Sequence, residues 1–255
     1  MRKKTFAWTS LLMLLVLLFS GCSKPDPLKV VYPETGKSRS AKLTIIFDDG
    51  YKDNFTEAFP IMRNVNVPGV IALVTSKIGA DPGYLTVEDC QLLWDNGWDL
   101  VSHTKTHQML SLLDQEALTL ELQESSEWVR NQGWNTTVLV SPYGAYNPDV
   151  IKKAQEYYRY HRALTNTFDT WPPQDSWRLG ASEVFGGSEK TTPAEVKQWI
   201  NYAYQNGLWL TLLFHHVGDE PASRFYYPLA EFREIIEYAA NHPIAKVTYR
   251  SALGF

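Results

Sequence analysis

The chain has 255 residues, of which 44% are hydrophobic and 20% charged, as expected for a globular protein with a full core. Its formal net charge of −4 argues against a general affinity for nucleic acid or for acidic membrane surfaces. Aromatic residues reach 13%. Such residues usually pack in the interior, and the alternative is that some of them stack on sugar rings.

The first segment predicts export rather than a folded element. Basic residues in "MRKK" precede an apolar run and then small residues before Cys22, which is the layout of a secretory signal. Ser20-Gly21-Cys22 resembles a bacterial lipobox, where the signal is cut before a cysteine that receives lipid. We therefore expect a signal peptide at 1–21 and a lipid-anchored tether at 22–40, at a membrane of a bacterial cell envelope. An uncleaved membrane anchor is the alternative.

After the tether, apolar runs alternate with segments of helical spacing. Strands buried on both faces are predicted at 43–47, 69–74, 98–102, 136–141, 161–165 and 208–214. Helices are predicted at 53–65, 86–96, 114–132, 148–158, 192–206 and 228–240. The alternation indicates an α/β domain over 41–255, either a (β/α) barrel or a doubly wound sheet. In both architectures the functional residues lie at the carboxyl ends of the strands. Cys90, in the second predicted helix, is expected to be a buried thiol.

The first predicted strand ends in two adjacent aspartates, Asp48 and Asp49. Because successive strand residues point to opposite faces, the two carboxylates should have different roles. A later strand is followed by "SHTKTH", in which His103 and His107 would share one face of a helical turn. One carboxylate and two imidazoles form a three-ligand set for Zn²⁺, with a fourth position left for water. Fe²⁺ or another divalent ion would suit the same ligands.

Two further strand ends carry groups that could act on a substrate. The strand at 136–141 leads into Pro142-Tyr143-Gly144, a turn whose backbone amide could face a substrate oxygen. The strand at 208–214 leads into His215, which could protonate a leaving group. A plain loop and a hydrogen-bonded core histidine are the respective alternatives.

These four stretches, in this order, resemble the motifs of the polysaccharide deacetylase family, also called the NodB-homology domain or carbohydrate esterase family 4. The resemblance extends over residues 41–250 and implies the family's distorted, incomplete (β/α) barrel. It implies Asp48 as the catalytic base, His215 as the acid and the Tyr143 amide at the oxyanion. Asp49, His103 and His107 would then bind one divalent ion, zinc.

The implied activity is metal-dependent removal of acetyl groups from an N- or O-acetylated polysaccharide, by a lipoprotein held to the membrane through Cys22. The alternative is a surface-tethered glycan-binding module without turnover. Intact candidates for an acid and a base argue against that alternative, because binding alone needs neither.

The sequence departs from the family pattern at two places. Val140 and Ser141 stand where many members have an arginine. Another basic residue is therefore expected beside Asp48, with Arg178 the first choice and Arg162 the second; a site without such a partner is the third alternative. The fourth motif has no clean match in "FDTWPPQDSWRLG" (168–180), whose aromatic residues either line a sugar cleft or pack in the interior.

Overall fold

The structure, a computed structural model, describes residues 41–134, 137–219 and 223–255. The predicted signal peptide and tether lie outside these ranges. Within them, no helix has the length and apolar character needed to cross a membrane. The described residues all belong to one compact unit, 31–255.

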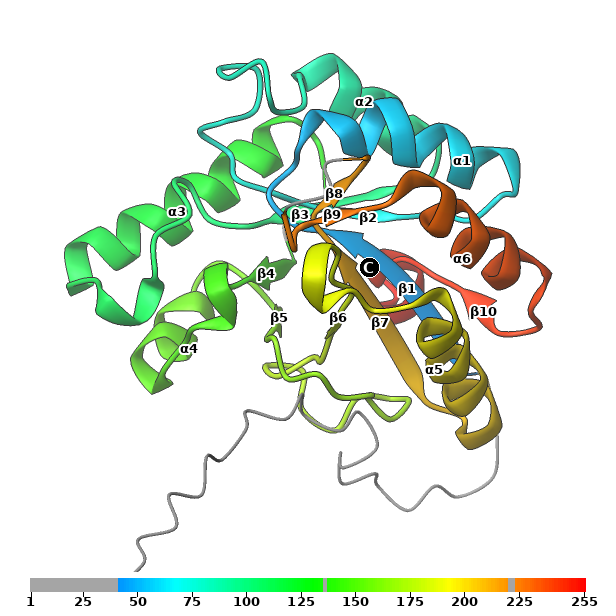
Figure 1. The fold of residues 1–255 in the computed structure, drawn as a ribbon. Helices are drawn as coiled ribbons and strands as arrows, with labels where there is room; N and C mark the ends of the chain where they lie inside the picture. The colour runs from blue at the N-terminus through cyan, green and yellow to red at the C-terminus, as the bar shows by residue number, and fades with distance from the viewer. Residues whose placement is uncertain (1–40, 135–136, 220–222) are drawn as a thin grey trace, which may run out of the picture. The chain divides into compact units, whose positions relative to one another are not determined.

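Parallel strands form one curled sheet, which Figure 1 shows at the centre of the described residues. The strands of this sheet are β1 (Lys42–Phe47), β2 (Val70–Leu73), β3 (Asp99–Ser102), β4 (Val138–Val140), β5 (Tyr160–Arg162), β6 (Ser182–Glu183), β7 (Trp209–Phe214) and β10 (Ala245–Lys246). Their order is β5-β4-β3-β2-β1-β7-β6, so β1 to β5 follow one another without reversal. A doubly wound sheet reverses its strand order at a switch point, and the barrel alternative is therefore the correct one.

The barrel is distorted at β1 and open between its edge strands. One edge of β1 is shared, because β10 pairs with Lys42 and Leu43 whereas β2 pairs with Ile46 and Phe47. Between the edge strands β5 and β6, the described residues form one isolated bridge, which joins Arg162 to Leu179. The prediction of a distorted, incomplete (β/α) barrel is confirmed.

The helices that lie between strands in the chain cover the outer face of the sheet (Figure 1). The helices are α1 (Phe59–Asn64), α2 (Val87–Asp95), α3 (Gln115–Asn131), α4 (Pro148–Ala154), α5 (Pro193–Asn206), α6 (Leu229–Asn241) and α7 (Tyr249–Leu253). Local sequence signals set several of their ends: Thr86 and Asp89 form a capping box on α2, and Pro193 begins α5, which ends at Gly207 in the left-handed conformation.

Most predicted elements are present, and the differences concern short ones. The helix expected at 53–65 is a π-helical turn (Asn54–Ala58) that runs directly into α1, and Pro60 is the second residue of α1. The two-residue strands and α7 were not predicted. Among these strands, β8 (His216–Val217) and β9 (Tyr226–Tyr227) pair separately from the main sheet. Elements this short have too few residues to show a periodicity.

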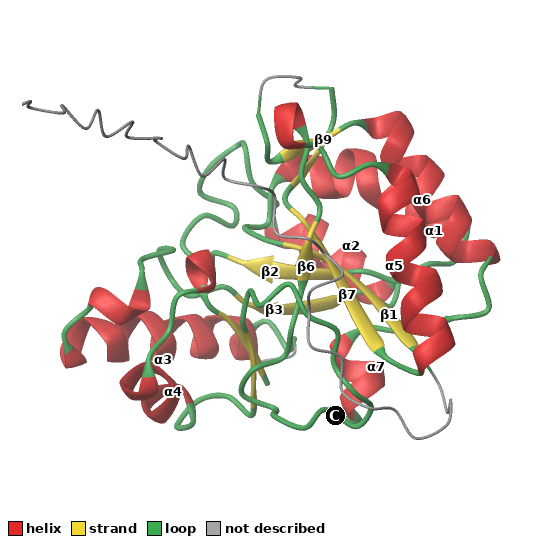
Figure 2. Cartoon of the chain, turned by 60° about the horizontal axis from the view of Figure 1, so that its bottom comes forward, coloured by secondary structure: helices red, strands yellow, loops and turns green. Residues whose placement is uncertain are grey.

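The hydrophobic core has an outer and an inner part. Alternate residues of β1, such as Phe47, pack outward against Phe232 of α6, whereas Ile46 points inward with Leu213 of β7. The inner part also includes Tyr249 of α7, a helix labelled in Figure 2. Cys90 is buried, as predicted.

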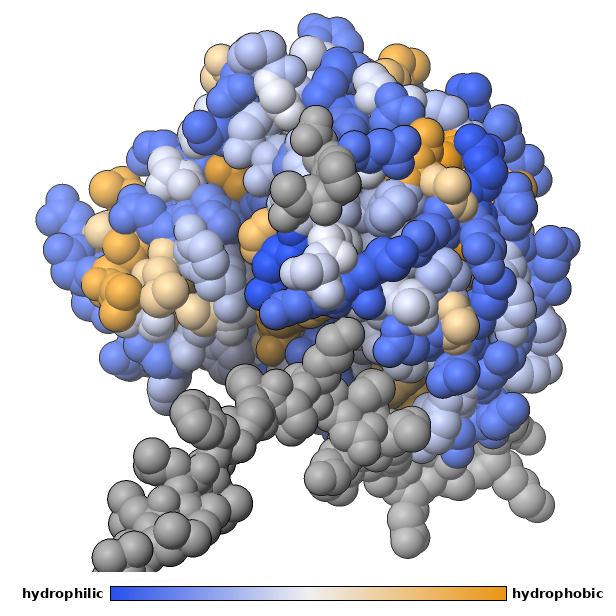
Figure 3. All heavy atoms as spheres, in the orientation of Figure 1, coloured by the Kyte–Doolittle hydropathy of each residue, from blue (hydrophilic) through white to orange (hydrophobic). Residues whose placement is uncertain are grey.

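On the surface shown in Figure 3, polar residues predominate and apolar residues form small separate groups. Scattered apolar side chains of this kind are normal for a soluble domain and indicate no particular function.

Candidate metal centre and active site

The two aspartates after β1 take different directions. Asp48 continues the strand, because its N–H donates to the Phe214 carbonyl at 3.0 Å, and its side chain follows Ile46 toward the inside of the barrel. Asp49 has φ 76, a left-handed conformation that ends the strand. Both carboxylates are buried. The two residues therefore differ in backbone conformation, and the expectation that their roles differ stays a prediction.

The loop after β3 carries His103 and His107 but is not helical. Thr104 has φ 67 and His107 has φ 65, both outside the helical region. The expectation that the two histidines share one face of a helical turn is therefore wrong. Each left-handed non-glycine residue costs about 1–3 kcal/mol, so the surrounding structure must hold this loop. The two rings still meet, with centroids 4.8 Å apart.

Asp49, His103 and His107 form a group that could hold a metal ion. Their ligand atoms all lie within 4.8 Å of one another. The Asp49 Oδ1 atom is 3.6 Å from His103 Nε2 and 3.2 Å from His107 Nε2. Two ligands bound at zinc distances and a tetrahedral angle lie about 3.4 Å apart. The separations therefore fit a small divalent cation.

The environment of His103 suits a metal ligand. Its Nδ1 lies 2.8 Å from the Val140 carbonyl, which can only accept, so Nδ1 carries the proton and Nε2 is left with a free lone pair. Burial lowers the pKa of His103, although the charges of Asp48 and Asp49 oppose that effect. A lowered pKa favours the neutral imidazole that metal binding requires.

Arg162, at the end of β5, is the basic partner of Asp48. Its guanidinium donates a hydrogen bond to Asp48 Oδ2, and the side chain is almost fully buried, with 1% exposed. The first choice of Arg178 is wrong: that side chain is exposed and does not line the site, and the second choice is correct. Burial would raise the pKa of Asp48, but Arg162 and the neighbouring histidines together hold that pKa below its usual value.

His215 lies on the other side of Asp48, beside a glutamate that the sequence analysis did not single out. Glu183, the last residue of β6, places Oε1 3.7 Å from His215 Nδ1. Burial and then the charge of Asp48 raise the pKa of Glu183 to about 7. Burial lowers the pKa of His215, with Asp48 and Asp49 opposing. Asn54 fixes the backbone here by donating from Nδ2 to the His215 carbonyl at 2.7 Å.

The Pro142-Tyr143-Gly144 turn forms a wall of the same site. Tyr143 has φ 58, and no described residue accepts a hydrogen bond from its backbone N–H. Gly144 has φ 63, and a Cβ atom there would meet Leu164 Cβ at 2.5 Å, so the turn requires glycine. Ser141 ties the turn to β5 through a 2.8 Å hydrogen bond with His161 Nε2.

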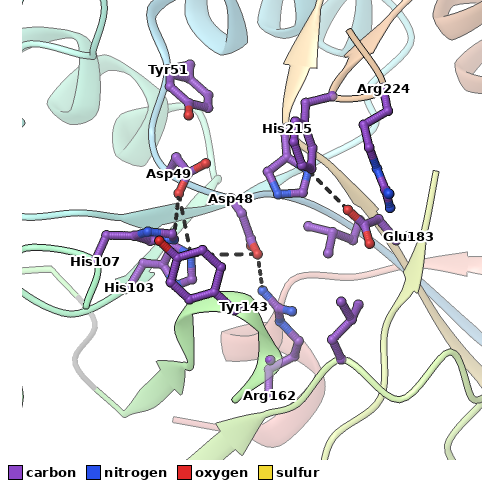
Figure 4. A pocket seen from close by; sticks show the side chains of 14 residues that line it. Asp48, Asp49, Tyr51, His103, His107, Tyr143, Arg162, Glu183, His215 and Arg224 are labelled. Carbon is purple, nitrogen blue, oxygen red and sulfur yellow. Dashed lines mark hydrogen bonds and ion pairs between the residues drawn. The ribbon is translucent and has the colours of Figure 1, made fainter. Parts of the chain in front are cut away.

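All six residues predicted for the site line one cavity of about 540 Å³, within the usual range for small-molecule sites. Figure 4 shows Asp48 in the middle, with the Asp49–His103–His107 group on one side and His215, Glu183 and Arg224 on the other. Arg224 and Phe225, which follow β8, were not predicted. No pattern in the sequence relates these two residues to the strand ends, because their approach depends on the path of the connecting loop.

The tryptophans of the segment 168–180 pack rather than line the cavity. Trp171 contacts Trp209 edge to face at 5.4 Å, and Trp177 packs against the cluster that joins α3 and α4. For this segment the packing alternative is correct. One local signal could have identified Glu183: the residue directly follows the short run "LGAS", where a strand end could have been predicted.

Comparison with solved structures identifies the class of fold. The Xyl-CE4 domain of a multidomain xylanase, from the hindgut metagenome of Trinervitermes trinervoides, superposes with a TM-score of 0.62 at 17% identity. The match covers 85% of this chain and 91% of that domain. The described residues thus have the curled half-barrel of the carbohydrate esterase family 4 fold.

Sequence comparison then identifies the family. Residues 35–160 match the family model described as polysaccharide deacetylase, and this part of the chain is a domain of that family. YxkH of Bacillus subtilis (strain 168), whose name also places it among polysaccharide deacetylases, is 27% identical over 133 residues, 52% of this chain. The poly-beta-1,6-N-acetyl-D-glucosamine N-deacetylase of Staphylococcus epidermidis is 24% identical over 187 residues, 68% of this chain. The matches span 47% and 64% of these relatives, about half to two thirds of their length.

Proposed function

We propose that the protein is a divalent-metal-dependent hydrolase that removes acetyl groups, chiefly N-acetyl groups, from an acetylated polysaccharide. The observation that carries the proposal is the convergence of one Asp–His–His group, a buried aspartate and a histidine on a single cavity. The name of the staphylococcal relative supports an N-acetylated glycan as the substrate class.

Asp49, His103 and His107 would hold the cation, for which we propose zinc. The ligand separations and the neutral state of His103 fit this role. When bound, the ion would supply Lewis acidity and lower the pKa of coordinated water toward neutrality.

Asp48 is the proposed base. Because Arg162 holds its pKa low, the carboxylate is ionised at neutral pH and can accept a proton from the attacking water. Its Oδ1 atom is buried and has no hydrogen-bond partner among the described residues, while Oδ2 is engaged by Arg162. The Oδ1 atom is therefore the oxygen left free to accept the proton.

Two further groups would act on the carbonyl oxygen of the acetyl group and on the leaving atom. The Tyr143 N–H can donate to the carbonyl oxygen as negative charge develops there. His215, across the cavity, can give a proton to the departing nitrogen, and its lowered pKa makes the protonated ring a stronger acid. Glu183, beside Nδ1, favours the protonated form when the glutamate is ionised.

We also propose that the mature protein is exported and held to a membrane of a bacterial cell envelope through lipid on Cys22. The proposal depends on the signal and lipobox residues, which lie outside the described ranges.

The test is acetate release from acetylated chitooligosaccharides and from acetylxylan, measured with and without a chelator. We expect release from the N-acetylated substrate, loss on chelation, and recovery with zinc. Asp48→Asn should abolish release, because an amide does not accept the proton. Binding of glycans without release of acetate from any substrate would instead favour a glycan-binding module.

A further inference from the structure

The loop between the two histidine ligands is held from outside. With Thr104 and His107 both left-handed, the loop lacks the repeating backbone hydrogen bonds of a helix. The loop makes one internal link, since the His107 N–H donates to Thr104 Oγ1 at 3.1 Å. The spacing of the two imidazoles therefore depends on contacts that other elements make with this loop.

Two sets of contacts hold this loop: the Thr75 and Ser76 N–H groups donate to the Thr104 and Lys105 carbonyls at 3.1 and 3.0 Å, and Glu121 of α3 binds the amide side of the loop. Its Oε2 accepts hydrogen bonds from the Lys105 N–H at 3.0 Å and from the Thr106 N–H at 2.9 Å. Its Oε1 accepts from the Thr106 hydroxyl and, at 3.4 Å, from the Gln108 amide. Donors to an ionised carboxylate form the stronger class of hydrogen bond. One carboxylate thus binds two of the three backbone amides that lie between the metal ligands.

The side chain of Glu121 is buried, with 4% exposed, although glutamate is rarely found inside a protein without a partner. The nearest loop cation does not neutralise it, because Lys105 Nζ pairs with Glu124 at 2.5 Å. The loop amides and the Thr106 hydroxyl satisfy the buried charge instead. Because these donors compensate the burial of the Glu121 carboxylate, they favour the one loop conformation in which all of them reach it.

A second contact from the same helix face fixes the start of the loop. Ser125, one turn after Glu121, bonds to Ser102 Oγ at 2.5 Å, and Ser102 Oγ accepts from the Thr104 N–H at 3.2 Å. Helix α3 therefore fixes the segment on both sides of His103.

We propose that Glu121 is a positioning residue for the metal group, setting the separation of His103 and His107 through the backbone of Lys105 and Thr106. The role depends on the metal site of the proposed function. It does not depend on the identity of the substrate, because metal binding by the full chain can be measured without turnover.

Zinc affinity of the full chain, measured by competition with a chromophoric chelator, tests this role in three variants. Glu121→Met keeps the length of the side chain and removes every acceptor, and it should weaken zinc binding by about 10–100-fold. Glu121→Gln retains a carbonyl oxygen for the two amides and should bind within about threefold of the wild type. Glu124→Met is the matched control: it removes a partly exposed carboxylate of the same helix that contacts only a side chain of the loop, and its affinity should not change.

The cobalt-substituted proteins provide a readout of geometry. The visible absorption bands of Co²⁺ report the arrangement of its ligands, and they should shift in Glu121→Met and not in Glu124→Met. Wild-type zinc affinity in Glu121→Met, or an equal loss in Glu124→Met, would overturn the proposal.

Should Glu121→Met fail to fold, Thr106→Val removes one donor of the same contact and should weaken zinc binding several-fold; unchanged affinity there would also overturn the role of Glu121. Zinc binding and acetate release of the wild type distinguish a failure of the Glu121 proposal from a failure of the proposed function. Zinc binding without acetate release would overturn the function and leave the role of Glu121 supported by the variants. No zinc binding by the wild type would overturn both.

Discussion

Arg162 donates a buried hydrogen bond to Asp48 from a strand 114 residues further along the chain. The pair joins the carboxyl end of β5 to that of β1, on opposite sides of the curled sheet. Both side chains are almost fully buried, so each charge depends on the other for compensation. Asp48, the proposed base, is thus held in place by this long-range contact, and Arg162 and the neighbouring histidines together keep its pKa low.

Arg162→Met is expected to lower the free energy of unfolding by about 3–5 kcal/mol at neutral pH, because it leaves the Asp48 charge buried without its partner. Acetate release should fall with it, while Arg178→Ala should change neither quantity. Urea unfolding and turnover would be measured in parallel. An Arg162→Met protein as stable and active as the wild type would show that Asp48 does not need this partner.

His103→Ala should remove most of the bound metal, because two protein ligands rarely hold zinc tightly. The measurement is metal content by elemental analysis after dialysis against buffer with trace zinc. His242→Ala, at a histidine after α6 that lies outside the cavity, is the control and should retain the metal. Full occupancy in the His103 variant would count against the ligand assignment.

Asp169 should make stability depend on pH. Burial raises its pKa to about 7, although the Gly180 N–H, which donates to Oδ2 at 2.9 Å, opposes the shift. Between about pH 4 and 7 the folded state therefore binds more protons at this site than the unfolded state, and the stability contribution falls as pH rises. Asp169→Asn keeps an acceptor for Gly180 and removes the titration.

The stability of Asp169→Asn relative to wild type should thus increase by on the order of 3 kcal/mol between pH 4 and pH 7. Urea unfolding of both proteins across this range measures the difference in their stability. The contributions of the other titrating groups cancel in this difference. The exposed Asp149→Asn serves as the control. A difference that stays constant with pH would show that the pKa of Asp169 is not raised.

Gly144→Ala should disturb the turn that carries Tyr143. The added Cβ would meet Leu164 Cβ at 2.5 Å, in a backbone conformation with φ 63. Gly97→Ala is the matched control, since Gly97 has φ 81 and nothing within 4 Å of the added Cβ. Both variants should lose about 1–2 kcal/mol from the left-handed conformation. Gly144→Ala should lose more stability than the control and should also lower turnover.

Cys22→Ala should move the protein from the membrane fraction to the soluble or uncleaved fraction. The several acyl chains of a lipoprotein anchor firmly, whereas one chain binds only marginally. Fractionation and the mass of the mature N-terminus provide the measurement. Identical fractionation of both forms, each with its signal intact, would favour an uncleaved membrane anchor.

Much of the fold could be predicted because its signals are local. Strands such as β1 and β7 show as continuous apolar runs within a few residues, and their alternation with helices implies parallel pairing. The site residues could be predicted for a related reason. In a parallel barrel the carboxyl ends of the strands meet at one edge, so polar residues after separate strands converge even when they are far apart in the chain. Asp48, His103, Tyr143 and His215 follow this rule.

The tertiary structure decided which charges meet and how the loops are held. Arg162 and Arg178 both border apolar runs, and only the pairing of β5 with β4 places the first of them inside the barrel. The i, i+4 histidines suggested a helical turn, but the carboxylate of Glu121 holds the loop in another conformation. Glu183 is brought to His215 by a two-residue strand on β7. A buried charge takes whichever partner the packing brings within a few ångströms, because its electrostatic interactions are strong there and water is excluded. That partner can lie anywhere in the chain, so no local pattern reveals it.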